Sequence, residues 1–224
     1  MYKVLKKSML FFILLILPLT AYTQKDVTQF LGIPVDGSKS EMMQKLKAKG
    51  YTISPYNKDV LVGEFNGTDV NIYIATNNNK VCRIMVSDVN TMNETDVRIK
   101  FNKLIQQFQN NKKYLSLPDS TVTKYNIPDD EDISYELSVK NKRYEAIFYQ
   151  KTTDYDALQT EMINLLKNGT PNEADKERIS AITKKMVEDS FNKTVWFMIS
   201  ENYGKYSISI YYDNEYNRAN GEGL

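Results

Sequence analysis

The chain has 224 residues, of which 29 are basic and 28 acidic, with no histidine and a single cysteine. Without histidine it cannot build a Ser-His-Asp or Cys-His catalytic arrangement, and it lacks the commonest protein ligand of zinc and other transition metals. The single cysteine, Cys82, excludes an intramolecular disulfide. Any catalysis would therefore have to use carboxylates, lysine, tyrosine or a serine-lysine pair.

The N-terminus has the pattern of a secretory signal peptide. Three lysines precede an uncharged apolar stretch from Met9 to Leu19, and small residues occupy positions 21 and 23. This order predicts cleavage after Thr23. The apolar stretch of 11 residues is too short to span a bilayer, which takes about 20. We therefore expect residues 1–23 to be removed and the mature protein to be periplasmic or secreted, with no integral membrane segment.

The mature part has a nearly balanced charge. Removing residues 1–23 takes away three lysines and no acid, so 26 basic and 28 acidic residues remain. Proteins that bind nucleic acids concentrate positive charge on one surface. The composition therefore predicts no nucleic-acid partner.

Residues 39–49 are predicted to form the first helix. Ser38 stands three residues before Glu41, which is the spacing of a capping box in which each residue bonds to the backbone of the other. Gly50 follows the last apolar residue of the pattern and is typical of a helix end. The helix is therefore bounded at both ends.

A three-stranded antiparallel meander is predicted next. Residues from Val70 to Ile74 alternate between apolar and polar, the pattern of a strand with one buried face. Asn66-Gly67 tolerates the positive φ angles of a tight hairpin. The predicted strands are 60–66, 69–76 and 80–87.

Cys82 is expected to be an inert core residue rather than a nucleophile. It alternates with Ile84 and Val86, so a period of two puts all three on one face of the strand. Free cysteine is also among the most frequently buried residue types.

Asn93 is predicted to cap a second helix. Five apolar residues follow at helical period and form a single face, namely Val97, Phe101, Leu104, Ile105 and Phe108. We expect this face to lie on the sheet.

The periodicity fades between residues 111 and 132, which indicates a loop and a weak boundary between two halves of one domain, residues 24–224. The acidic run Asp129–Asp132 lies at its end. Four consecutive acids do not alternate ligand and spacer as a calcium loop does, so a solvated loop is favoured.

The second half is expected to hold a hairpin and two helices. Alternation at Tyr135, Leu137 and Val139 predicts a strand that pairs with residues 144–150. Apolar residues at helical spacing predict helices over 155–167 and 173–190.

Two further strands are predicted near the C-terminus. Val195–Ile199 is apolar on both faces, which is typical of a central strand covered on both sides or nearly so. Residues 206–212 resume strict alternation. Residues 70–77 and 206–213 share apolar and polar positions, so a decayed duplication and chance alternation are both open.

These elements together predict an α+β fold. An antiparallel sheet is expected to be built from helix-plus-meander units, with a duplication of that unit as one alternative, and the helices are expected to pack on one face of the sheet.

Three stretches carry a resemblance to a known family, namely Phe30–Glu41, Gly63–Val70 and Tyr211–Asn214. On these residues the chain resembles an uncharacterised family of exported proteins from Bacteroidetes, which has no assigned activity to carry over. More distantly, the layout is similar to that of β-lactamase inhibitor proteins and of small outer-membrane assembly lipoproteins, although their lipid-bearing or paired cysteines are missing. The likeness of layout implies binding rather than catalysis.

An aromatic cluster near the C-terminus is the candidate ligand-binding site. An aromatic patch beside Asn and Asp suits a carbohydrate or a peptide, because the rings give apolar area and polar handles. Strands are also rich in tyrosine for packing reasons alone. The candidate residues are Trp196, Tyr203, Tyr206, Tyr211, Tyr212 and Tyr216. No catalytic residue, metal ligand or cofactor is predicted.

The sequence thus favours a non-catalytic binding or envelope-maintenance module whose partner is a protein or glycan of the cell envelope. The alternative is a glycan-acting hydrolase that uses two carboxylates facing one another about 5 to 10 Å apart. Four acids near predicted strand ends are the candidates for that chemistry, namely Glu64, Asp69, Asp88 and Glu136.

Overall fold

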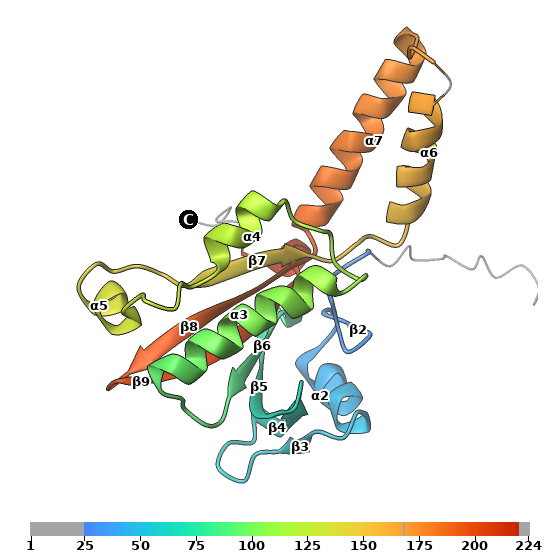
Figure 1. Ribbon diagram of the computed structural model, residues 1–224. Helices are drawn as coiled ribbons and strands as arrows, with labels where there is room; N and C mark the ends of the chain where they lie inside the picture. The colour runs from blue at the N-terminus through green and yellow to red at the C-terminus, as the bar shows by residue number, and fades with distance from the viewer. Residues whose placement is uncertain (1–24, 168, 220–224) are drawn as a thin grey trace, which may run out of the picture.

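The structure, a computed structural model, describes residues 25–167 and 169–219, so the predicted signal peptide lies outside the described residues. It confirms the α+β fold with an antiparallel sheet (Figure 1). Seven strands are arranged in the order β3-β4-β5-β6-β9-β8-β7. No helix in the described part of the chain is long and apolar enough to cross a membrane.

The strands of the main sheet are β3 (Thr52–Ile53), β4 (Val60–Phe65), β5 (Thr68–Asn77), β6 (Lys80–Asp88), β7 (Glu145–Tyr149), β8 (Thr194–Asn202) and β9 (Lys205–Asp213). The helices are α2 (Lys39–Ala48), α3 (Glu94–Asn110), α4 (Asp119–Tyr125), α5 (Ile133–Ser138), α6 (Tyr155–Lys167) and α7 (Glu173–Phe191). A small ribbon of β1 (Gln29–Phe30) and β2 (Ile33–Pro34) precedes them, and a short 3-10 helix, η1 (Glu215–Asn217), follows.

The predicted caps of the first two helices are confirmed. The hydroxyl of Ser38 accepts a hydrogen bond from the backbone of Glu41 at 3.3 Å, and the Glu41 carboxylate accepts one from the Ser38 backbone at 3.0 Å. The Asn93 side chain likewise accepts from the backbone N–H of Asp96 at 2.9 Å. These bonds satisfy N–H groups that a helix start otherwise leaves without partners.

The meander β4-β5-β6 also forms as predicted. Asn66 and Gly67 adopt φ angles of 52° and 74°, and the two strands pair from Phe65 opposite Thr68 onward. Both turn residues thus use the left-handed region that a tight hairpin requires.

Helix α3 lies across one face of the sheet and closes the core (Figure 1). All five apolar residues predicted for its inner face are buried. They meet a group of aromatic rings from β7 and β8, in which Phe197 lies 5.0 Å from Phe101, 5.4 Å from Phe108 and 6.1 Å from Phe148. Ring packing across the helix-sheet interface therefore joins residues from both halves of the chain.

The predicted hairpin of 135–139 with 144–150 is wrong. Residues 133–138 form helix α5, and β7 pairs with β8 instead. Asp132 explains the helix, because its side chain accepts from the Tyr135 backbone at 2.8 Å and caps the first turn. Tyr135 and Val139, two residues of the apparent alternation, are 48% and 59% exposed.

The stretch expected to be a loop, residues 111–132, also contains helix α4. Its cap residue, Pro118, has no side-chain acceptor for the first backbone N–H groups, and no residue of the helix is buried. A helix of seven residues with neither a polar cap nor an apolar stripe leaves little periodic signal in the sequence.

Strand β8 is covered on one face and not on both. Val195, Phe197 and Ile199 are buried, whereas Trp196 and Met198 between them are half-exposed. The strand is also second from the edge of the sheet rather than central. The uncovered side chains matter for the candidate site.

Cys82 is half-buried and does not belong to the core. A β-bulge shifts the register of β5 and β6 between Ala75 and Thr76, so Val81 takes the buried position that alternation assigned to Cys82. Burial nevertheless raises the pKa of the Cys82 thiol despite the neighbouring Arg83 guanidinium. The thiol is therefore a poor nucleophile at neutral pH.

Residues 70–77 and 206–213, whose sequence patterns are similar, belong to strands that do not occupy equivalent positions in the sheet. Outward from the pairing of β6 with β9, the strand order is β6-β5-β4 on one side and β9-β8-β7 on the other. In this arrangement β9 corresponds in position to β6, whereas residues 70–77 belong to β5. The sequence alignment thus does not follow the layout of the sheet.

The two predicted helices of the second half are confirmed as α6 and α7. They pack on each other as a hairpin that projects away from the sheet (Figure 1). Arg178 of α7 and Glu161 of α6 join them through two hydrogen bonds of 2.6 and 3.0 Å. No residue of α6 is buried, so this hairpin contributes little to the core.

From the aromatic packing under α3 we predict that substitutions in this group of rings lower the stability of the fold most. Phe197→Ala is expected to lower the free energy of unfolding by about 3 to 5 kcal/mol, because it empties a site surrounded by three rings. Chemical denaturation measures this change. The control Tyr203→Ala, at a residue that is 97% exposed, should stay within about 0.5 kcal/mol. Equal losses for both variants would contradict this account of the core.

Candidate functional site

The sheet face opposite α3 carries a continuous line of apolar side chains, which we call the aromatic row. The strand register places Tyr73 of β5 next to Met85, Met85 next to Tyr211, Tyr211 next to Trp196, and Trp196 next to Ile147. These residues alternate with the buried ones, so they point away from the core. Each remains half-exposed or exposed. The row therefore crosses five strands on an accessible surface.

Two rings of the row stack on each other at its centre. Trp196 and Tyr211 lie with their centroids 4.0 Å apart and their planes 12° apart. The guanidinium of Arg83 lies over both rings, 5.4 Å from the Trp196 centroid and 5.1 Å from that of Tyr211. A cation at this distance is attracted by the ring faces and holds both side chains in place.

Asp213 anchors this group. Its carboxylate accepts two hydrogen bonds from Arg83, at 2.5 and 2.8 Å, and a third from the indole nitrogen of Trp196 at 2.9 Å. Asp213 is 2% exposed, and its hydrogen bonds to Arg83 raise the pKa of that guanidinium. The fork-to-fork geometry fixes the direction of both side chains.

A hollow of about 760 Å³ opens beside this group, and we call it the open-face groove. Its volume lies within the range of ligand-binding clefts. Tyr149 and Phe191 meet edge to face at its rim, with centroids 5.7 Å apart. The lining residues are Arg83, Arg143, Glu145, Ile147, Tyr149, Phe191, Asn192, Thr194, Trp196, Asp213, Glu215 and Arg218.

The three acids in the groove are all engaged by arginine. Asp213 is held by Arg83, as described above. Glu145 pairs with Arg143 at 3.0 Å, and Glu215 pairs with Arg218 at 2.9 Å. The groove therefore offers aromatic area and fixed charges, a combination that suits binding.

Comparisons with protein-family models, curated proteins and solved structures found no match.

The predicted aromatic cluster is divided by the structure. Trp196 and Tyr211 come together in the aromatic row. Tyr206 and Tyr212 point to the opposite face and are buried in the core. Tyr203 lies at the tip of the β8–β9 hairpin and is 97% exposed, away from the row.

Tyr216 lies in η1, beside the groove rather than in its lining. Its hydroxyl accepts a hydrogen bond from the Asn192 side chain at 3.1 Å. The ammonium of Lys25 lies 4.5 Å from the centre of its ring. Tyr216 thus joins η1 to Lys25 and to Asn192 beside the groove.

Several residues of the site were not identified from the sequence, namely Arg83, Tyr73, Met85, Tyr149 and Phe191. Alternation along β6 placed Arg83 on the outer face, which was the available signal. Its partner Asp213 is 130 positions away, and the pairing of β6 with β9 leaves no mark on either strand alone.

The four acids considered for glycan hydrolysis are dispersed. Glu64 and Asp69 face one another across β4 and β5, and both are exposed. Asp88 pairs with Lys100 at 2.6 Å, and Glu136 pairs with Lys140 at 2.6 Å. None of the four lines the open-face groove.

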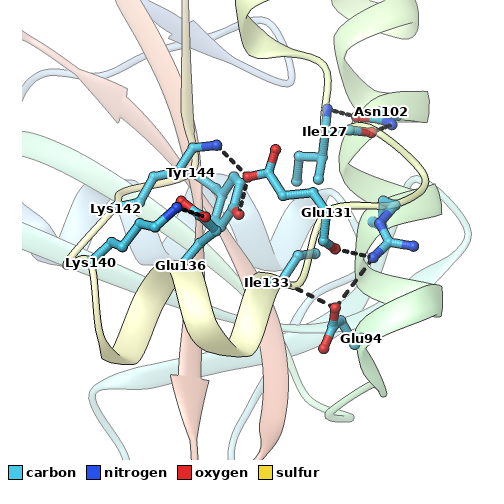
Figure 2. Close-up of polar contacts among 10 residues, drawn as sticks. Glu94, Asn102, Ile127, Glu131, Ile133, Glu136, Lys140, Lys142 and Tyr144 are labelled. Atoms are coloured by element: carbon cyan, nitrogen blue, oxygen red, sulfur yellow. Dashed lines mark hydrogen bonds and ion pairs between the residues drawn. The ribbon is translucent and has the colours of Figure 1, made fainter.

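The acidic run at 129–132 serves the local structure (Figure 2). The Glu131 carboxylate accepts hydrogen bonds from Lys142 and Tyr144, and its backbone carbonyl accepts one from Arg98 at 2.6 Å. Asp132 caps α5. Over residues 25–167 and 169–219, no group of three or more acids, cysteines or histidines has the arrangement of a metal site.

Hydrogen bonding changes the proton affinity of this cluster. Burial acts to raise the pKa of Glu131, but the hydrogen bonds from Lys142 and Tyr144 outweigh it, so that its pKa falls below 4.5. Burial raises the pKa of Tyr144, and the hydrogen bond to Glu131 raises it further.

The Asp213 anchor generates a stability prediction. Asp213→Asn is expected to lower the free energy of unfolding by about 2 kcal/mol, because it leaves Arg83 without its counter-charge. Urea unfolding followed by the fluorescence of Trp196, the single tryptophan, measures this loss. The matched variant Glu215→Gln, in an exposed pair with Arg218, should change stability by less than about 0.5 kcal/mol. An unchanged Asp213→Asn protein would contradict the anchoring role.

Glu131 generates a prediction for acid pH. Because the pKa of Glu131 is depressed in the folded state, its contribution to the free energy of unfolding is present above pH 4.5. That contribution is lost as the pH falls through the lowered pKa of the folded state. Glu131→Gln should therefore reduce the fall in stability on going from pH 5 to pH 3, as measured by denaturation at each pH. Asp130→Asn, in the same run, should leave this fall unchanged. If the stability of the Glu131→Gln protein falls between pH 5 and pH 3 as much as that of the wild type, this role of Glu131 is refuted.

Proposed function

We propose that the chain is an exported, non-catalytic binding protein of the cell envelope that binds a protein partner through its open-face groove and aromatic row. The export rests on the signal-peptide pattern of residues 1–23. The envelope setting also agrees with the resemblance to exported Bacteroidetes proteins.

The observation that carries the proposal is the composition of the uncovered sheet face. Trp196, Tyr211, Met85 and Tyr73 lie side by side in the strand register. The guanidinium of Arg83 lies against the Trp196 and Tyr211 rings. Tryptophan, tyrosine, methionine and arginine are the residue types enriched at protein interfaces, and aromatic and arginine anchors carry most of the binding energy. Side chains fixed by the Asp213 anchor also lose less conformational entropy on binding.

The same geometry favours a protein over a glycan. Trp196 and Tyr211 each use one ring face for their mutual stack, and Arg83, 5.4 and 5.1 Å from the two ring centres, lies along the edge that they share, so the pair offers less open ring face than two separate rings would. A sugar ring that stacks on an aromatic side chain needs an open ring face. The face instead presents ring edges, a methionine and guanidinium groups. This combination suits the mixed apolar and polar surface of a polypeptide.

The acids argue for binding over hydrolysis. Glycoside hydrolysis needs one carboxyl group that donates a proton and a second that attacks or activates water. Asp213, Glu145 and Glu215 are each paired with an arginine inside the groove. Each of these three carboxyl groups is already engaged by a guanidinium, so none of them is free to take either role.

Photo-crosslinking in intact cells tests the proposal. A photoreactive residue at position 73 should capture a defined envelope protein, and the same residue at position 203 should not. With the identified partner, Tyr73→Glu is expected to weaken binding at least about tenfold, because it puts a charge in the apolar row. Tyr203→Glu makes the same change at a residue that is 97% exposed and outside the row, and it should leave affinity unchanged.

Two outcomes would overturn the proposal. The first is capture of the same proteins from positions 73 and 203, since the row would then give no specificity. The second is release of reducing ends from an envelope glycan by the pure protein, which would favour a hydrolase built on Glu64 and Asp69.

A further inference from the structure

A second concave region lies on the helix-bearing side of the sheet, at the C-terminal end of α3. It consists of two adjoining cavities of about 440 and 460 Å³. Both are lined by Leu31, Phe65, Asn111, Tyr114 and Tyr212, so they share a common wall. None of these residues lines the open-face groove. The two cavities therefore adjoin, and together we call them the inner cavity.

One half of the inner cavity is apolar. Its walls include Leu104, Phe108 and Ile210, which are 4%, 8% and 6% exposed. Leu31 lies over it at the β1–β2 turn, with φ at 53°, and is 37% exposed. Among the described residues of this lining Glu64 is the one that carries a charge, and its side chain is exposed. This half suits an aliphatic chain.

The other half is rimmed by lysines. Lys112, Lys113, Lys151 and Lys193 line it, and the described part of the chain adds a single acid there, Asp156. Lys151 pairs with Asp156 at 3.2 Å, and Lys193 pairs with Asp26. Lys112 and Lys113 are exposed and form no ion pair with any residue of the described ranges. An anionic group would supply the counter-charge that these two side chains lack.

A buried hydroxyl lies between the two halves. Tyr114 is 8% exposed, and its hydroxyl oxygen accepts a hydrogen bond from the Gln150 side chain at 3.3 Å. The Tyr114 and Tyr212 side chains also lie within hydrogen-bonding reach of each other. Burial raises the pKa of Tyr114, so the hydroxyl stays protonated at neutral pH. A ligand oxygen that enters between the two halves can accept this proton, since a hydroxyl both donates and accepts.

We propose that the inner cavity binds a free, unbranched aliphatic carboxylate of the fatty-acid class. The aliphatic chain lies against Phe65, Leu104 and Phe108, and the carboxylate lies near Lys112 and Lys113, where it accepts a hydrogen bond from Tyr114. The order of an apolar chamber, a buried donor and a cationic rim along one cavity matches the order of groups in such a ligand. This inference does not depend on the proposed protein partner.

Isothermal titration of the mature chain with decanoate tests the proposal. Decanoate should bind with one molecule per chain. Decyltrimethylammonium, which has the same chain and the opposite charge, and acetate, which has the same head and no long chain, should each bind at least about tenfold more weakly. Tyr114→Phe keeps the ring and removes the hydroxyl, so it should weaken decanoate binding about tenfold.

Charge reversal provides the matched comparison. Lys112→Glu with Lys113→Glu should weaken decanoate binding at least about tenfold. Lys58→Glu with Lys80→Glu makes the same change in net charge at exposed lysines outside the cavity and should leave the affinity within about twofold. All four substituted residues are exposed, so the fold should persist, as circular dichroism verifies. Absence of decanoate binding, equal binding of the cationic analogue, or equal losses in both double variants would overturn the proposal.

Discussion

The pairing of β6 with β9 is the interaction on which the rest of the structure depends. It joins residues 83–87 to 209–213 and thereby makes one sheet from the strands of two distant stretches of chain. The same pairing brings Arg83 to Asp213 and Met85 to Tyr211 on the open face, and Ile84 to Tyr212 in the core. Contacts between residues so far apart in sequence carry a large loop-closure cost, which the packing under α3 has to offset.

Features with a local cause could be predicted from the sequence. The caps at Ser38 and Asn93, the Asn66-Gly67 turn and the alternation of β5 each depend on residues within a few positions of one another. Helix α5 was missed because Asp132, a cap with a clear local signal, stands before a stretch that also alternates. The position of Cys82 was missed because a bulge is a property of two paired strands and not of one.

The candidate site was predictable only in part, for a related reason. Composition and alternation pointed to the aromatic strands, and the candidates included Trp196 and Tyr211, which the structure brings together on the open face. They could not separate these from Tyr206 and Tyr212, whose side chains are buried on the other face. The inner cavity left no trace, because its walls come from β1–β2, β4, α3 and β9 and meet only in the folded chain. Which side chains meet on a surface built from several strands depends on the register in which those strands pair. The sequence of one strand alone does not specify that register.

The helical hairpin α6–α7 is inserted between two neighbouring strands whose ends already meet. The backbone N–H of Gln150 donates to the carbonyl of Lys193 at 2.9 Å, so the β7–β8 ladder continues to the base of the insertion. The entropy of closing a longer or shorter excursion changes only slowly with its length. The sheet therefore tolerates changes in the length of this arm beyond its base, whereas at the base Phe191 and Asp156 belong to the linings of the open-face groove and the inner cavity.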